Sequence, residues 1–245
     1  MIRSFPRRSV LASLAGLPAL ALLAACSDSG GGGGEAQAPQ TPAPEAPATP
    51  APATPPAAAA PAPSGKVDMA KLLEEGALPD KTIGNADAPV TIVEYASMTC
   101  SHCASFHNET LPAIKERYID TGKARLIFRE FPFDPRAEAG FMLARCADDK
   151  YFAMVDVLFK QQRNWAAVEN AREALLQIAR LAGFSQESFE ACLTDQKLLE
   201  DVRAVRTRGA TDFAIDATPT FFINGNKYSG ALKVDEMSAV IDSLL

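Results

Sequence analysis

The feature that most restricts how this chain of 245 residues can fold is Cys100-Ser101-His102-Cys103, which stands where a strand-like run meets a helix-like run. Residues 89–96 are β-branched and almost continuously apolar, a composition that predicts a strand covered on both faces. After Cys100 the apolar residues recur at helical spacing as far as Tyr118, and Gly122 ends the predicted helix. The pattern therefore predicts an α/β fold that holds two cysteines at a strand-to-helix turn.

The rest of the chain continues this α/β pattern without an internal repeat. Residues 124–131 predict a second strand, and a long helical stretch follows over about 135–210. A short strand at 220–223 leads into the hairpin turn Asn224-Gly225-Asn226, and a final helix carries its apolar face on Val234, Met237, Val240, Ile241 and Leu244. The predicted order is strand, helix, strand, several helices, two strands and a helix.

Residues 1–25 predict a cleaved signal peptide rather than part of the fold. Three arginines form a basic start, and the apolar run that follows is shorter than the ~20 residues of a comfortable membrane span. Leu23-Ala24-Ala25-Cys26 is similar to the lipobox of bacterial lipoproteins, in which the cysteine is lipidated and becomes the new N-terminus. We expect lipidation of Cys26 in preference to the alternative, an unmodified cysteine near a cleavage site. The paired arginines also partly match a twin-arginine export signal.

Residues 26–65 predict a disordered tether, and residues 66–245 predict one globular domain. The tether holds a run of five glycines and ten of the chain's eighteen prolines, and it offers few residues that could form a core. Pro-rich chain tends towards the extended polyproline conformation at ~3.1 Å per residue, so the tether could hold the domain up to ~100 Å from a membrane. The remaining stretch of roughly 180 residues suffices for one hydrophobic core.

The charge of the chain argues against a nucleic-acid partner. Its formal net charge is −6, and removal of residues 1–25 takes away three arginines and no acid, which leaves about −9. The acidic chain contains no basic run that would bind a phosphate backbone. We therefore expect protein partners and a membrane contact through the lipid, and no nucleic acid.

The two cysteines of the strand-to-helix turn predict disulfide exchange. The amino end of a helix presents unpaired N–H groups and about half a positive charge, which can lower a cysteine pKa from ~8.5 into the range ~3.5–7.5. Cys100, nearer the helix end, is the predicted nucleophile, and Cys103, one turn further in, is the predicted resolving thiol. His102 would favour the thiolate if it were protonated or donated a hydrogen bond. His107 is predicted to be an ordinary helix residue on a neighbouring face.

A structural zinc site is the alternative interpretation of the cysteine pair. Structural zinc usually needs four ligands, and the chain has two histidines and no second cysteine pair at metal-like spacing. Redox chemistry is therefore favoured, with no metal and no cofactor. Two further cysteines, Cys146 and Cys192, fall in the helical stretch and could pair in an oxidising compartment. We favour this structural disulfide over two separate buried thiols.

A proline stands directly before the short apolar strand, in the run Ala217-Thr218-Pro219-Thr220. A proline at this position cannot donate a hydrogen bond to a strand ladder, and it restricts the residue before it. On the residues alone we expect a trans Thr218–Pro219 bond, because cis bonds are a minority of X–Pro bonds.

Three ordered motifs make the chain resemble the DsbA family of bacterial disulfide oxidoreductases over roughly residues 78–245. They are Cys-x-His-Cys after Val-Glu-Tyr, Thr-Pro before Phe-Phe-Ile-Asn-Gly, and the helical insertion between the halves of the sheet. The resemblance implies a thioredoxin-like mixed sheet with an inserted helical domain. It also implies a cis Thr218–Pro219 bond beside Cys100, where backbone can pair with the substrate chain. Glu94 is implied to be a buried acid that assists proton transfer to or from Cys103, rather than an exposed strand carboxylate.

The resemblance implies a thiol oxidase of the periplasm or another extracytoplasmic compartment. The Cys100–Cys103 disulfide would pass to exported proteins with free thiols, and a membrane thiol oxidase would reoxidise the dithiol. Ser101 stands where the family often has proline, and the dipeptide between the cysteines tunes the redox potential, so a reductase or disulfide isomerase on the same fold stays open. A third hypothesis is of another class: a holdase, or a protein that binds a soft metal through its two thiolates.

Overall fold

The strands assemble into one mixed sheet in the computed structural model, which describes residues 59–245. In this part of the chain six strands lie in the order β1-β6-β5-β3-β4-β2. β3 and β4 are parallel, and the other neighbouring pairs are antiparallel. β3 is buried along its whole length and carries the chain towards Cys100. The bounds are β1 Gly65–Lys66, β2 Lys81–Gly84, β3 Val90–Ala96, β4 Ala124–Glu130, β5 Thr220–Ile223 and β6 Asn226–Ser229.

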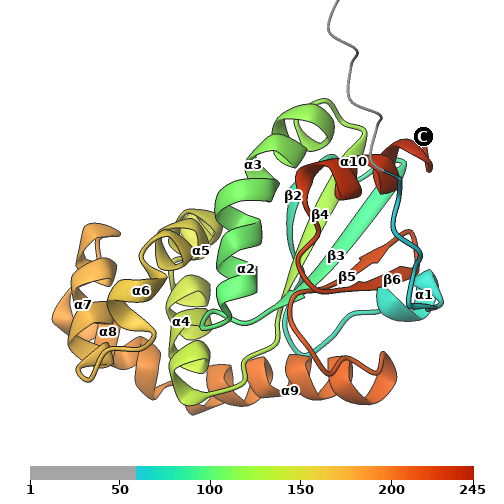
Figure 1. Ribbon diagram of the computed structural model, residues 1–245. Coiled ribbons are helices and arrows are strands. Elements are labelled where there is room, and N and C mark those ends of the chain that lie inside the picture. Colours follow the sequence, from blue (N-terminus) through green and yellow to red (C-terminus); the bar gives the residue numbers. More distant parts are fainter. Residues whose placement is uncertain (1–58) are drawn as a thin grey trace, which may run out of the picture. The chain divides into compact units, whose positions relative to one another are not determined.

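One face of the sheet is covered by the helix that follows β3 and by the C-terminal helix α10, Val234–Asp242 (Figure 1). The helix after β3 begins as α2, Ser101–Ser105, and continues through α3, Leu111–Ile114. Two π-helical turns, Phe106–Thr110 and Lys115–Ile119, follow α2 and α3 respectively. Such turns add a residue to the helical ring and are frequent at functional sites.

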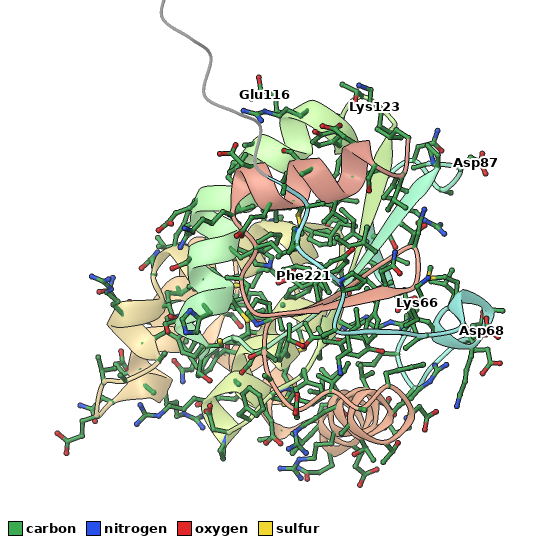
Figure 2. The ribbon with its side chains drawn as sticks, turned by 45° about the vertical axis from the view of Figure 1, so that its right-hand side comes forward. Lys66, Asp68, Asp87, Glu116, Lys123 and Phe221 are labelled. Atoms are coloured by element: carbon green, nitrogen blue, oxygen red, sulfur yellow. A yellow bond between two sulfur atoms is a disulfide. The ribbon has the colours of Figure 1, made fainter. Side chains whose placement is uncertain are left out.

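The layer between this face and its helices is made of buried aliphatic and aromatic side chains. The ring centroids of Phe106 and Phe221 are 4.6 Å apart, and both side chains are buried. Figure 2 shows Phe221 inside the molecule, whereas the charged side chains of Asp87, Glu116 and Lys123 lie at its periphery. Burial of apolar side chains at ~25 cal/mol per Å² is the main favourable term that holds these layers together.

The interval between β4 and β5 is filled by helices, which confirms the predicted helical insertion. Asp134 and Pro135 set where it begins, because the Asp134 carboxylate accepts hydrogen bonds from two N–H groups of the first turn and proline is favoured there. The insertion packs around the buried Trp165 in a core that it shares with β3, β4 and α2, and its last helix, α9, covers the second face of the sheet (Figure 1). The bounds are α4 Pro135–Cys146, α5 Tyr151–Lys160, α6 Gln162–Trp165, α7 Ala171–Leu181, α8 Gln186–Thr194 and α9 Gln196–Asp212.

A disulfide joins Cys146, at the end of α4, to Cys192 in α8. The two Cα atoms are 6.2 Å apart, and the cysteines are separated by 46 residues along the chain. In the chain-entropy model, closing a loop of this size stabilises the fold by up to about 4 kcal/mol. The bridge fixes two helices of the insertion relative to each other.

The structure adds two strands, β1 and β2, that the sequence pattern does not predict. β1 has only two residues, and β2 alternates half-buried and exposed residues at the edge of the sheet. Such strands are defined by distant partners rather than by local composition, as in the pairing of Gly65 with Lys227. Gly65 falls within the predicted tether, so the ordered sheet begins before the predicted domain boundary. A short helix, α1, spans Met69–Leu72.

Several predictions concern residues that the structure does not describe. The signal peptide at 1–25, the lipidation site Cys26 and most of the tether lie outside residues 59–245. Within the described range, no helix is long and apolar enough to cross a membrane.

Gly209 lets α9 approach the sheet closely. A Cβ at this position would lie 3.0 Å from Tyr95 and 3.2 Å from Phe131. Because both neighbours are buried rings, we expect Gly209→Val to lower the free energy of unfolding by roughly 2 kcal/mol, as overpacking usually does. Urea denaturation measures the loss. Ala204→Val, at an exposed position of the same helix, is the matched control and should change stability by less than about 0.5 kcal/mol. Equal losses in both variants would contradict the tight packing.

Candidate active site

Cys100 occupies the N-cap position of α2, directly after the loop that leaves β3. Its backbone is extended, with φ −76° and ψ 120°, and its N–H donates to the Ser97 carbonyl at 3.1 Å. The Cys100 carbonyl accepts the first helical hydrogen bond from the Ala104 N–H, also at 3.1 Å. This geometry places the sulfur beside the free N–H groups of the first helical turn. Cys100 and Cys103 are both free thiols in this structure.

The surroundings of Cys100 lower the pKa of its thiol from 9.0 to about 5. The largest cause is a hydrogen bond from the Cys103 thiol, and partial burial opposes it. The backbone N–H groups of Cys103 and His102 lower the pKa further. At neutral pH Cys100 is therefore a thiolate, the form that attacks a disulfide and that leaves readily from one.

Cys103 has the opposite environment. Its side chain is fully buried, and burial raises the pKa of its thiol well above the usual value. The hydrogen bond to Cys100 and the negative charge of Glu94 raise it further. One sulfur of the pair is thus held as a thiolate at the surface and the other as a thiol in the interior. This asymmetry assigns Cys100 to attack and Cys103 to resolution.

The Thr218–Pro219 peptide bond is cis, so the trans bond expected from the residues alone is wrong and the cis bond implied by the family resemblance is present. Local sequence could not settle this, because the isomer is fixed by tertiary contacts around the loop. The Cys100 sulfur lies 3.3 Å from the Thr218 carbonyl oxygen, to which it donates only in its protonated form. The Thr218 hydroxyl is buried and has no hydrogen-bond partner within the described structure. The loop therefore lies directly against the reactive sulfur.

Glu94 is fully buried in β3, and the alternative of an exposed strand carboxylate is wrong. Both of its carboxylate oxygens face Nε2 of His107, at 3.1 and 3.0 Å. The His107 ring stacks on Phe159 with centroids 4.3 Å apart and meets the edge of Phe128 at 5.2 Å. A carboxyl group so far from water requires such a partner.

The sequence predicts an ordinary helix residue at His107, and the structure places this histidine in the interior against Glu94. His107 follows Cys103 by four residues, and side chains four apart lie on the same helix face. That spacing was the signal by which the sequence could have grouped His107 with Cys103. The histidine singled out instead, His102, has an exposed side chain that makes no hydrogen bond in the described structure. His102 acts on Cys100 through its backbone N–H.

Metal ligands do not gather around the two thiols. Among residues 59–245 no group of three or more His, Cys, Asp or Glu side chains is arranged to hold a metal ion. The opposite environments of Cys100 and Cys103 support the chemistry of a dithiol and a disulfide.

The chain is similar to known disulfide-exchange proteins. A thioredoxin family model matches residues 77–243. A protein of Rickettsia bellii named "Putative protein-disulfide oxidoreductase" is 35% identical over 173 residues, which are 68% of this chain and 64% of that protein. The "Probable disulfide bond formation protein D" of Bacillus anthracis is 31% identical over 153 residues, 60% of this chain and 70% of that protein. The chain thus spans less than two thirds of the Rickettsia relative.

Solved structures support the same comparison. The crystal structure of alpha-DsbA1 from Wolbachia pipientis has a TM-score of 0.66 and 36% sequence identity. The match covers 71% of this chain and 94% of that one. The similarity therefore extends over both the sheet and the helical insertion.

The low pKa of Cys100 depends on Cys103. In the reduced protein we expect a Cys100 pKa of about 5, and we expect Cys103→Ala to raise it because the largest stabilising hydrogen bond is lost. Hydrogen bonds to charged groups are worth about 1.5–3 kcal/mol, so the expected rise is roughly one to two units. The pH dependence of thiolate absorbance and of alkylation rate measures it. An unchanged pKa in Cys103→Ala would show that the helix end alone stabilises the thiolate.

Proposed function

The chain belongs to the DsbA family of thioredoxin-fold proteins, and on this basis we propose that it is a protein thiol–disulfide oxidoreductase that donates the Cys100–Cys103 disulfide to exported proteins. The observation that carries the proposal is the opposite shift of the two sulfurs. The pKa of Cys100 lies at about 5, whereas that of Cys103 is raised. A stabilised Cys100 thiolate favours the dithiol state, so the disulfide is readily given up.

The reaction starts from the oxidised pair. A client thiolate attacks the Cys100 sulfur, a new S–S bond forms between client and Cys100, and the Cys100–Cys103 bond breaks. The electron pair of that bond goes to Cys103, whose buried sulfur takes up a proton because its raised pKa favours the thiol. Glu94 is the acid within electrostatic range that supplies this proton, and His107 holds it in place.

The second half of the reaction releases the client. A second client thiolate attacks the client sulfur of the mixed disulfide, and the client leaves with two of its own sulfurs joined. Cys100 departs as a thiolate, which its low pKa makes a good leaving group. The client is oxidised by two electrons, and the enzyme is left as the dithiol that this structure shows.

The Thr218–Pro219 loop is the proposed site of client backbone pairing. The Thr218 carbonyl lies 3.3 Å from the Cys100 sulfur, so a client chain that reaches Cys100 must pass over this loop. Return to the disulfide requires an oxidant, for which we propose a membrane thiol oxidase. In that direction Glu94 takes the proton from Cys103, which then attacks the mixed disulfide between Cys100 and the oxidase.

The proposed setting is extracytoplasmic and close to a membrane. The basic and apolar start of the chain supports export, and Leu23-Ala24-Ala25-Cys26 supports lipidation of Cys26. The Cys146–Cys192 disulfide fits an oxidising compartment such as the periplasm. The Pro-rich segment between the lipid and the domain would let the active site reach clients at a distance from the bilayer.

The direction of the reaction is tested by equilibrating the oxidised domain with a glutathione redox buffer. We expect a reduction potential well above that of the glutathione pool, because the Cys100 thiolate stabilises the dithiol. A potential near ~−270 mV, that of thioredoxin, would favour the reductase or isomerase instead. The control is Cys103→Ala, which should trap clients as mixed disulfides. Free, accessible thiols that do not exchange would leave only the holdase or metal-binding hypotheses.

Glu94 and His107 give a second test. We expect Glu94→Gln to slow the step in which Cys103 attacks a mixed disulfide by roughly 10²-fold, because the proton acceptor is lost. The pKa of Cys103 should fall at the same time, since the Glu94 charge raises it. His107→Gln keeps a hydrogen bond to Glu94 and should retain most of the rate. Stopped-flow measurement of Cys103 attack across pH checks both. Equal rates in Glu94→Gln and the unaltered protein would remove Glu94 from the mechanism.

A further inference from the structure

Gln162 is the first residue of α6, and its side chain is buried against the loop that carries Cys100. The amide nitrogen donates two hydrogen bonds of 2.9 Å, one to the Met98 carbonyl and one to the Cys100 carbonyl. A side-chain amide has two N–H donors, and this loop takes both of them. One side chain therefore holds the loop on both sides of Thr99.

The helix that carries Gln162 is anchored in the core of the insertion. Trp165, at the other end of α6, is fully buried, and its ring N–H donates to the Leu158 carbonyl at 2.9 Å. A second contact from the insertion reaches the same loop, because the Thr99 hydroxyl donates to the carboxylate of Asp134 at 2.5 Å. Gln162 and Asp134, both from the insertion, thus form hydrogen bonds with the three residues Met98–Cys100.

We propose that Gln162 is a positioning residue for Cys100, which acts on the sulfur through the loop carbonyls that it holds. The proposal rests on the proposed thiol exchange at Cys100 and assigns part of its control to the helical insertion. The Cys100 sulfur meets the N–H groups of the first helical turn only while Cys100 keeps its extended N-cap backbone. The Gln162 amide fixes the backbone of Cys100 by its hydrogen bond to the Cys100 carbonyl. It fixes the chain two residues earlier by its hydrogen bond to the Met98 carbonyl.

A second effect of the Gln162 amide acts in the same direction. A carbonyl oxygen carries negative partial charge, and two such oxygens near a thiolate would repel it if no donor faced them. Loss of the amide would also leave the Met98 carbonyl, for which the described structure provides no other partner, buried and unpaired. Either response, a moved loop or an unpaired carbonyl, raises the pKa of Cys100.

The test is Gln162→Met, which keeps the length and the approximate volume of the side chain and removes both donors. We expect the Cys100 pKa to rise by roughly one unit from its value of about 5. Because the thiolate is then less stable, the equilibrium with glutathione should shift about tenfold towards the disulfide, which lowers the potential by about 30 mV. Gln162→Glu, which turns a carboxylate towards the carbonyls, should raise the pKa further than Gln162→Met does.

Thr110→Val is the matched control. The Thr110 hydroxyl is also buried and also donates to a loop carbonyl, that of Leu232 at 3.1 Å, but it lies away from the catalytic loop. We expect a comparable loss of stability in urea and an unchanged Cys100 pKa. If Gln162→Met destabilises the fold without changing the Cys100 pKa, Gln162 is only structural and the proposal fails. Absence of thiol exchange in the unaltered protein would instead defeat the proposed function, because the pKa measurement needs no client.

Discussion

The hydrogen bonds that converge on the Cys100 sulfur depend on several distant parts of the chain at once. β3 must end and α2 must begin at this residue, so that the N–H groups of His102 and Cys103 face the sulfur. The hydrogen bond from the Cys103 thiol, the largest contribution, requires the first helical turn to be intact. A thiolate in a half-buried site needs hydrogen-bond donors or positive charge, and here backbone N–H groups are among the donors.

The interior side of the site follows a different physical rule. Cys103, Glu94 and His107 are all buried, and the polar groups of Glu94 and His107 are unfavourable there unless they are paired. A buried hydrogen-bonded pair of this kind is weak evidence for stability, because apolar residues of the same volume often serve as well. Glu94 stands in a strand that is otherwise apolar in its inner positions, with one histidine as its partner. Its position in this strand supports the proposed role in proton transfer at Cys103 rather than a role in packing.

The sequence allowed those parts of the site to be predicted that depend on residues close together in the chain. The strand, the turn and the helix around Cys100 follow from local periodicity, and the fold class and helical insertion follow from the order of such segments. The cis bond at Pro219 and the strands β1 and β2 depend on partners far away in the chain, so no local pattern encodes them. His107 is a different case, because the sequence shows its four-residue spacing from Cys103 but does not show that its side chain is buried. Gln162, more than sixty residues after Met98, could be recognised only in three dimensions.

The helical insertion is best understood as part of the active site rather than as an added domain. Its core around Trp165 includes Ala96 of β3, Phe128 of β4 and Cys103 of α2, so the insertion packs directly on the sheet and on the catalytic helix. Its contacts with the catalytic loop are polar and specific: Asp134, at the start of α4, holds Thr99, and α6 holds the carbonyl of Cys100. The Cys146–Cys192 disulfide ties the far end of α4 to α8. The same helix therefore connects the disulfide at its far end to Thr99, the residue next to the nucleophile, at its start.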